Sequence, residues 1–132
     1  MADAIDIYGT AFKNGSVTLL ARIVGAQGGY VLPTDINSAQ YTVYLLDDQN
    51  ADNRTPVADH SGVSISLAEV LFTTLQTDPM WTVDTTGYNF RHVLDISVHP
   101  AFTIADRRYL IEYQLTSATG QVILIRFRIN VI

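Results

Sequence analysis

Acidic and amide side chains alternate along one polar stretch of the chain, and this spacing could bind calcium. Asp48, Asn50 and Asp52 match the first ligand positions of an EF-hand-type loop, and Asp59 falls at its last position. Asn53 stands where that loop needs glycine, and no helical pattern precedes the stretch. Aspartate and asparagine are also common in turns, where they accept bonds from nearby backbone N–H groups. We therefore predict a solvated loop and no metal site, with calcium as the alternative.

Three histidines could bind a metal or act as bases if folding brought them together. They are His60, His92 and His99, and they are separated along the chain. His92 lies in an alternating run, on the same face as Phe90 and Leu94. A single histidine on an apolar face is usually a hydrogen-bonded core residue, and we expect that role for His92.

The residue types of a hydrolase triad occur together in Asp59-His60-Ser61. Neighbours on an extended chain point to opposite faces, so this run alone cannot form a triad. An enzyme would require two or more of His60, His92, Asp59 and Asp95 to converge in a pocket. The sequence also has no glycine-rich phosphate loop and no nucleophile elbow. We therefore predict no enzymatic activity, no catalytic residues, no cofactor and no small-molecule substrate.

Arginines on the polar faces of strands could instead contact another protein. Arg91, Arg126 and Arg128 would form an arginine-rich strip if their strands were neighbours, and this strip would pair with acidic patches on a partner. The alternative is a solvated face on which Glu112 and Asp95 are the counter-ions.

The composition narrows the class of protein. The chain has 132 residues, enough for one domain with a core, and 48% of them are hydrophobic. A net charge of −5 without a basic stripe argues against nucleic-acid binding, and no apolar run is long enough to span a membrane. Residues 1–6 lack the features of a secretion signal, and there is no cysteine. Sparse charge with seven tyrosines fits a surface partly covered by protein, or simply an aromatic-rich β protein.

The C-terminal part of the chain predicts a long β-hairpin over 109–116 and 122–131. Both runs alternate with a period of two, and residues 118–120 supply a short loop with Gly120 at its positive-φ position. This loop sets Ile111 opposite Phe127 and Tyr113 opposite Ile125, so the apolar faces coincide. It also sets Glu112 opposite Arg126.

The rest of the chain predicts further strands and one short helix. Strands are expected over 17–24, 39–46 and 88–98, and a helix over about 66–75, where Ser66 and Glu69 suggest a capping box. We predict an all-β fold, an antiparallel immunoglobulin-like sandwich with residues 17–132 as a single domain. Residues 1–16 are expected to be an N-terminal arm or an edge strand. Their interface candidates are Ile5, Ile7, Tyr8 and Phe12.

The strand 106–115, the turn at Gly120 and the final apolar strand resemble the end of a known kind of domain. Small immunoglobulin-like domains of tailed-bacteriophage virion proteins are similar there, and the stretch Asp84-x-x-Gly87-Tyr88-Asn89 also belongs to the resemblance. The resemblance implies a structural virion protein, most simply a capsid decoration (cement) protein that bridges neighbouring subunits. Its partners would be major capsid or tail subunits and other copies of itself, in a virion assembled in the host cytoplasm. A tail or baseplate accessory protein is an alternative.

A carbohydrate-binding sandwich is a further alternative. Trp81 with Tyr30, Tyr41 or Tyr88 would supply the aromatic surfaces on which sugar rings stack.

Overall fold

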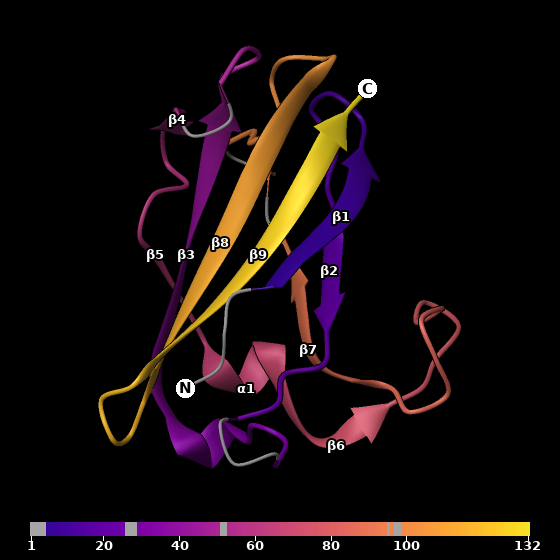
Figure 1. Ribbon diagram of the computed structural model, residues 1–132, viewed down its shortest axis with the longest axis vertical. Coiled ribbons are helices and arrows are strands. Elements are labelled where there is room, and N and C mark those ends of the chain that lie inside the picture. The colour runs from indigo at the N-terminus through magenta and orange to yellow at the C-terminus, as the bar shows by residue number, and fades with distance from the viewer. Residues whose placement is uncertain (1–4, 26–28, 51–52, 95, 97–98) are drawn as a thin grey trace.

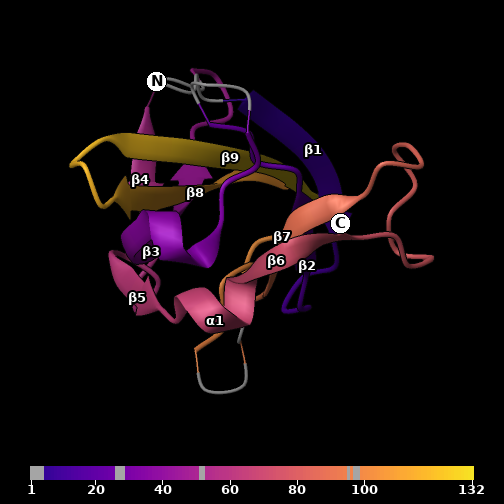
Figure 2. The ribbon, with the colours of Figure 1, turned by 90° about the horizontal axis from the view of Figure 1, so that it is seen from below.

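The chain folds into a sandwich of two β-sheets (Figures 1 and 2). The computed structural model describes residues 5–25, 29–50, 53–94, 96 and 99–132. The larger sheet has the order β1-β9-β8-β3-β4, with β5 also paired to β3, and the smaller sheet has the order β2-β7-β6. The strands are β1 (Ile5–Ala11), β2 (Thr18–Ala21), β3 (Ile36–Leu46), β4 (Arg54–Pro56), β5 (Val63–Ile65), β6 (Leu71–Gln76), β7 (Tyr88–Val93), β8 (Arg107–Ser117) and β9 (Val122–Val131).

The predicted all-β antiparallel sandwich is confirmed. The sheets place β2, β7 and β6 on one side and β9, β8 and β3 at the centre of the other. The hydroxyl of Tyr109, near the start of β8, accepts a bond from the N–H of Ile104 at 3.2 Å, as a tyrosine corner does. One pairing departs from the antiparallel pattern, because β1 runs parallel to β9.

The predicted C-terminal hairpin and its register are also confirmed. Ile111 lies opposite Phe127, Tyr113 opposite Ile125 and Glu112 opposite Arg126. Ser117 N–H donates to the carbonyl of Gln121 at 2.7 Å across the turn, and Gly120 has φ +90°. The inner faces of β8 and β9 form much of the core, where the ring of Tyr113 contacts those of Phe127 and Phe90 with centroids 5.7 and 4.9 Å apart.

The predicted helix over about 66–75 is wrong in its extent. Helix α1 covers only Leu67–Val70, and residues 71–76 form strand β6 beside β7. The segment Leu71-Phe72-Thr73-Thr74 is rich in aromatic and β-branched residues, and Leu71 is buried opposite Phe90, so sheet pairing overrides the helical spacing. The Ser66 side chain makes no cap bond; its backbone carbonyl accepts the N–H of Glu69.

The remaining elements differ from prediction mainly in length. Strand β2 is shorter than the predicted 17–24, and β7 ends at Val93, while residues 95, 97 and 98 of the predicted 88–98 strand lie outside the described part of the chain. A short 3-10 helix, η1, covers Pro33–Asp35. Neither helix in the described ranges is long and apolar enough to cross a bilayer.

Within the first sixteen residues, 5–11 form an edge strand rather than an unpaired arm. Strand β1 lies at the end of the larger sheet, next to β9 (Figure 1). Residues 1–4, and the side chains of Ile5, Ile7 and Tyr8, lie outside the described part of the structure. Phe12, the fourth interface candidate of this segment, is 72% exposed.

Candidate functional site: the β6–β7 loop and the groove beside it

Two of the three histidines, His60 and His92, lie against the buried ring of Tyr41. The Tyr41 ring lies 6.0 Å from the ring of His60 and 5.3 Å from that of His92. His60 is 2% exposed, and its Nε2 bonds the carbonyl of His99 at 2.6 Å. That contact makes Nε2 the donor, so in the neutral ring Nδ1 accepts from the Tyr41 hydroxyl at 2.8 Å. Both ring nitrogens of His60 are therefore used in holding the core together.

His92 is half-buried beside the core, so the expected core position is met only in part, and it is hydrogen-bonded through Nδ1 to the hydroxyl of Tyr113. Burial lowers the pKa of His92 to about 4 and raises the pKa of Tyr113 well above its ordinary value. Both side chains are thus neutral at pH 7, which suits a buried structural pair.

Of the two acidic candidates, Asp59 does not join His60 and His92. Asp59 lies at the surface, where its carboxylate is 3.2 Å from Nδ1 of His99. Asp95 lies outside the described residues. The run Asp59-His60-Ser61 is therefore divided between the surface and the core, and it forms no triad.

The candidate calcium stretch forms a turn in the part that the structure describes. Asp47, just before it, accepts the N–H groups of Gln49 and Asn50, and these bonds lower its pKa. Asp48 lies 2.7 Å from Nε of Arg107, as an ion pair without hydrogen-bond geometry. Asp52 lies outside the described residues, and the rest of the described chain holds no group of three or more His, Asp or Glu side chains suited to a metal.

The predicted arginine strip is interrupted. Arg126 and Arg128 belong to β9 in the larger sheet, whereas Arg91 belongs to β7 in the smaller one, so the strands are not neighbours. Glu112 is the counter-ion of Arg126, at 2.8 Å, and it also lies 3.7 Å from Arg54. Of the two counter-ions in the alternative interpretation, Glu112 is therefore in place, while Asp95 lies outside the described residues.

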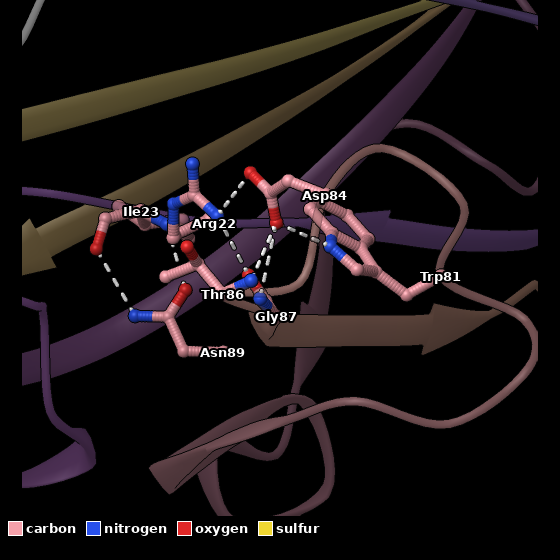
Figure 3. A network of polar contacts seen from close by, with 7 residues as sticks. All are labelled: Arg22, Ile23, Trp81, Asp84, Thr86, Gly87 and Asn89. Atoms are coloured by element: carbon pink, nitrogen blue, oxygen red, sulfur yellow. Dashed lines mark hydrogen bonds and ion pairs between the residues drawn. The ribbon is translucent and has the colours of Figure 1, made fainter.

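A different feature stands out from the body of the molecule: the loop between β6 and β7, residues 77–87. It projects beyond the edge of the sandwich (Figure 2). Its organising residue is Asp84, whose Oδ1 accepts bonds from the N–H groups of Thr86 and Gly87 and from Nε1 of Trp81, at 3.0, 3.2 and 2.9 Å (Figure 3). One carboxylate thus holds both the backbone of the turn and the largest side chain of the loop.

Arg22, which follows β2, attaches this loop to the smaller sheet. Its Nη1 lies 2.7 Å from Oδ2 of Asp84 and donates to the carbonyl of Gly87 at 3.1 Å (Figure 3). The bond from Trp81, the contact with Arg22 and the Gly87 N–H together hold the pKa of Asp84 well below its ordinary value. Asp84 is therefore charged at any pH near neutrality.

The strand end beneath the loop is fixed by a buried amide. Asn89 accepts the N–H of Ile23 at 2.6 Å and donates to the carbonyls of Ile23 and Val31, at 3.0 and 3.1 Å. Beside it, Gly87 has φ +106°, and a Cβ there would lie 2.4 Å from the carbonyl oxygen of Gln76. Only glycine fits that position without a shift of the backbone.

Aromatic contacts join the loop to the smaller sheet. The Trp81 ring lies against Tyr88, with centroids 5.6 Å apart, and Tyr88 meets Phe72 edge-on at 5.9 Å. The hydroxyl of Tyr88 donates to Asp78, and burial together with this carboxylate raises the pKa of Tyr88. The loop is thus tied to the body through side chains at both of its ends.

This rigid loop presents apolar side chains to the outside. Met80 and Val83 are 49% and 72% exposed. They line one wall of a groove of about 230 Å³ that lies between β1 and β2, where the two sheets meet the loop. The floor includes the buried residues Leu19, Phe127 and Ile129, and every side chain that lines the groove is uncharged. The lining is Gly9, Thr10, Val17, Thr18, Leu19, Leu20, Met80, Trp81, Thr82, Val83, Phe127 and Ile129.

The sequence predicts a turn at residues 84–87 but assigns no chemistry to the stretch from Asp84 to Asn89. The available signal was the spacing itself, an aspartate three residues before a glycine, which is typical of an Asx-stabilised turn. The long-range partners Arg22 and Ile23 carry no signal in the sequence, since pairing of β2 with β7 brings them there.

No family model matches the chain, and no curated protein matches it.

Proposed function

We propose that this chain is a structural assembly protein that binds neighbouring protein subunits through the tip of the β6–β7 loop and the groove beside it. The observation that carries the proposal is a loop held by side-chain bonds to its own backbone and to the sheet, with exposed apolar side chains at its tip. Single exposed apolar side chains are ordinary on protein surfaces, but Met80 and Val83 are presented together, next to an uncharged groove.

Rigidity matters because binding orders mobile side chains and loops at a cost in free energy. The Asp84 network and the Trp81–Tyr88 contact hold the loop in place before a partner arrives. Methionine and tryptophan are also enriched in protein interfaces, while charged residues are depleted at their centres. The lining of the groove, which includes Met80 and Trp81 and no charged residue, has this composition.

Within this proposal, a tailed-phage virion is the assembly that the resemblance of residues 106–132 favours, and capsid decoration is the simplest role. A decoration protein adds buried area at many equivalent contacts, so one small apolar surface per chain acts repeatedly. A tail or baseplate accessory role uses the same surface with a different partner.

The test is co-sedimentation of the chain with tailed-phage particles. The chain would be produced in the culture that makes the particles, and the particle fraction would be separated on a density gradient. We expect the unmodified chain to travel with the particles, and the double variant Met80→Asp, Val83→Asp to stay at the top of the gradient, because two buried charges would oppose docking.

Val93→Asp is the matched control. Val93 is as exposed as Met80 but lies at the end of β7 and does not line the groove. This variant should still sediment with the particles. Equal sedimentation of all the variants, or an unmodified chain that never leaves the top fraction, would contradict the proposal.

A carbohydrate-binding function is the second candidate, and a second groove favours it. Tyr41 and Tyr88 are buried, so they cannot serve as stacking surfaces, whereas Tyr30 is 45% exposed. Tyr30 lines a groove of about 410 Å³ with Thr34, Asp35 and residues of the β8–β9 turn. Binding of a neutral glycan on an array, lost in Tyr30→Ala, would support this function, and an array without signal would remove it.

A further inference from the structure

We propose that the groove binds an extended, uncharged strand of a partner protein, which adds to the open edge of β1. This inference rests on the proposed function, because it names how the partner would occupy the same surface. It concerns the backbone of β1 in addition to the apolar side chains of the loop.

Strand β1 has one neighbour and one open edge. It is the last strand of the larger sheet and pairs only with β9 among the described strands. Ile132 N–H donates to the carbonyl of Ala11 at 2.9 Å, and Lys13 N–H donates to the carbonyl of Ile132 at 2.8 Å. Backbone groups alternate in direction along a strand, so the N–H and C=O of Thr10 point away from β9. The open edge ends there, because the carbonyl of Phe12 accepts the N–H of Gly15 at 2.8 Å.

Strand β2 borders the other side of the groove and is also an edge. Leu94 N–H donates to the carbonyl of Val17 at 3.0 Å, so by the same alternation the backbone groups of Thr18 and Leu20 face away from β7. The groove therefore lies between two open edges. We assign the added strand to β1, because β1 spans seven residues and β2 only four, and a longer edge offers more main-chain bonds.

The absence of charge in the groove indicates which class of partner segment it would bind. The chain has a net charge of −5, yet no charged side chain lines the groove. A charged segment would lose its hydration there without gaining a counter-ion, whereas an uncharged segment would not. In an added strand every second side chain would point toward the floor made by Leu19, Phe127 and Ile129, which favours apolar residues at alternate positions.

Open edges are usually protected in soluble proteins, since they pair with other chains. Strand β1 lacks one common form of protection at its described C-terminal end, because Gly9, Thr10 and Ala11 are uncharged and none is proline. A built groove with an apolar floor beside such an edge is the arrangement by which strand addition combines main-chain bonds with side-chain pockets.

The experiment uses the full chain and a short fluorescent peptide in which valine alternates with serine and threonine. Fluorescence anisotropy should give a Kd of about 0.1 mM or tighter. A second peptide has the same side chains but carries N-methyl groups at the positions whose N–H would face β1. We expect it to bind at least about tenfold more weakly, because it cannot make the main-chain bonds. A third peptide, with aspartate in place of valine, should not bind.

Protein variants test the edge itself. Thr10→Pro removes only an outward N–H and is compatible with an edge strand, so it should weaken binding of the first peptide at least about tenfold. Thr10→Val keeps the N–H, so the loss of affinity in Thr10→Pro beyond that in Thr10→Val measures the main-chain bond. If Thr10→Pro does not fold, the comparison of the first two peptides decides alone.

Equal affinity for the plain and N-methylated peptides, or no binding of the plain peptide at about 1 mM, would overturn strand addition. These outcomes are separate from those of the particle experiment. Loss of sedimentation in the Met80→Asp, Val83→Asp variant combined with equal peptide affinities would leave the assembly function standing and remove the strand-addition mode.

Discussion

Two loops of this protein each have an aspartate that accepts backbone N–H groups, but the two aspartates differ in how far along the chain their other partners lie. Asp47 accepts the N–H groups of Gln49 and Asn50, both of which lie within three residues of it. Asp84 makes the same kind of local contact with Thr86 and Gly87, but it also holds Trp81 and Arg22. The bonds of Asp47 are all local, and Arg107 reaches the loop after β3 only through the exposed neighbour Asp48, whereas Asp84 itself contacts a residue more than sixty positions away in the chain.

This difference indicates that an aspartate turn holds a loop in a fixed position when residues distant in sequence add bonds to it. The local bonds of either aspartate could form in an isolated peptide. The bond to Arg22 and the buried clamp of Asn89 on Ile23 require the pairing of β2 with β7. The β6–β7 loop should therefore be as ordered as the sheet that supports it.

Removing the buried clamp should have the largest effect. In Asn89→Ala the N–H of Ile23 and the carbonyls of Ile23 and Val31 lose their partner in a buried site, at a cost of about 3 kcal/mol in the free energy of unfolding. Urea denaturation followed by tryptophan fluorescence measures this. On the other loop, Asn53→Ala should leave the unfolding midpoint unchanged, because the Asn53 side chain is exposed. A loss below about 1 kcal/mol in Asn89→Ala would show that the clamp is not what holds the strand end.

Gly87→Ala should have the next largest effect, about 2 kcal/mol, because a non-glycine residue is strained at φ +106° and its Cβ would meet the Gln76 carbonyl. Gly62→Ala is the matched comparison, since Gly62 also has positive φ, at +60°, but its Cβ would meet nothing within 4 Å. Thermal unfolding of both variants separates strain from steric contact. Equal losses at the two glycines would mean that the contact with Gln76 is relieved without cost.

A fall in pH should affect the stability that His92 contributes to the core but not the charge of Asp84 in the loop. The pKa of His92 is about 4 when folded and about 6.5 when unfolded, so the unfolded chain binds more protons as the pH falls. The stability that His92 contributes is complete above pH 6.5 and is lost progressively toward pH 4. We expect a decrease of roughly 1–2 kcal/mol, reduced from the full shift because the ring is partly solvated. Asp84 stays charged across this range, since its pKa is lowered.

Urea denaturation at several pH values, with His92→Gln as the control, measures this decrease. The slope between pH 6.5 and 4 should be shallower in the variant. A slope that is identical in the two proteins would place the acid sensitivity elsewhere.

The smallest effect is expected at Asp47. Its carboxylate is exposed and makes only local bonds, so Asp47→Ala should leave the melting temperature unchanged within experimental scatter. Asp84→Ala should instead accelerate amide exchange of Thr86 and Gly87 at least about tenfold, by releasing the loop. An unchanged exchange rate of Thr86 and Gly87 in Asp84→Ala would remove the distinction between the loops.

Sequence patterns predicted those parts of the fold whose partners lie close together in the chain. The hairpin of β8 and β9 was predicted with its register, because alternation and the Gly120 turn leave one consistent pairing. The helix over 66–75 was predicted too long, because the helical spacing of Leu67, Val70 and Leu71 is also compatible with a short helix that runs directly into a strand.

The site was harder to predict than the fold. Arg91, Arg126 and Arg128 looked alike in sequence, but the assignment of β7 and β9 to different sheets separates them. Conversely, Arg22, Asp84 and Asn89 gave no shared signal, and only the contact between β2 and β7 brings them together. Long-range strand pairing is the information that a single sequence lacks.

Amide hydrogen exchange of the two loops tests the central claim most directly, because it reports order at each N–H without a partner present. The account predicts that the amides of Thr86 and Gly87 exchange slowly, on the scale of the β7 strand, and that those of Gln49 and Asn50 exchange near the unprotected rate. Rapid exchange in both loops would show that the β6–β7 loop is not preorganised, and would contradict the account.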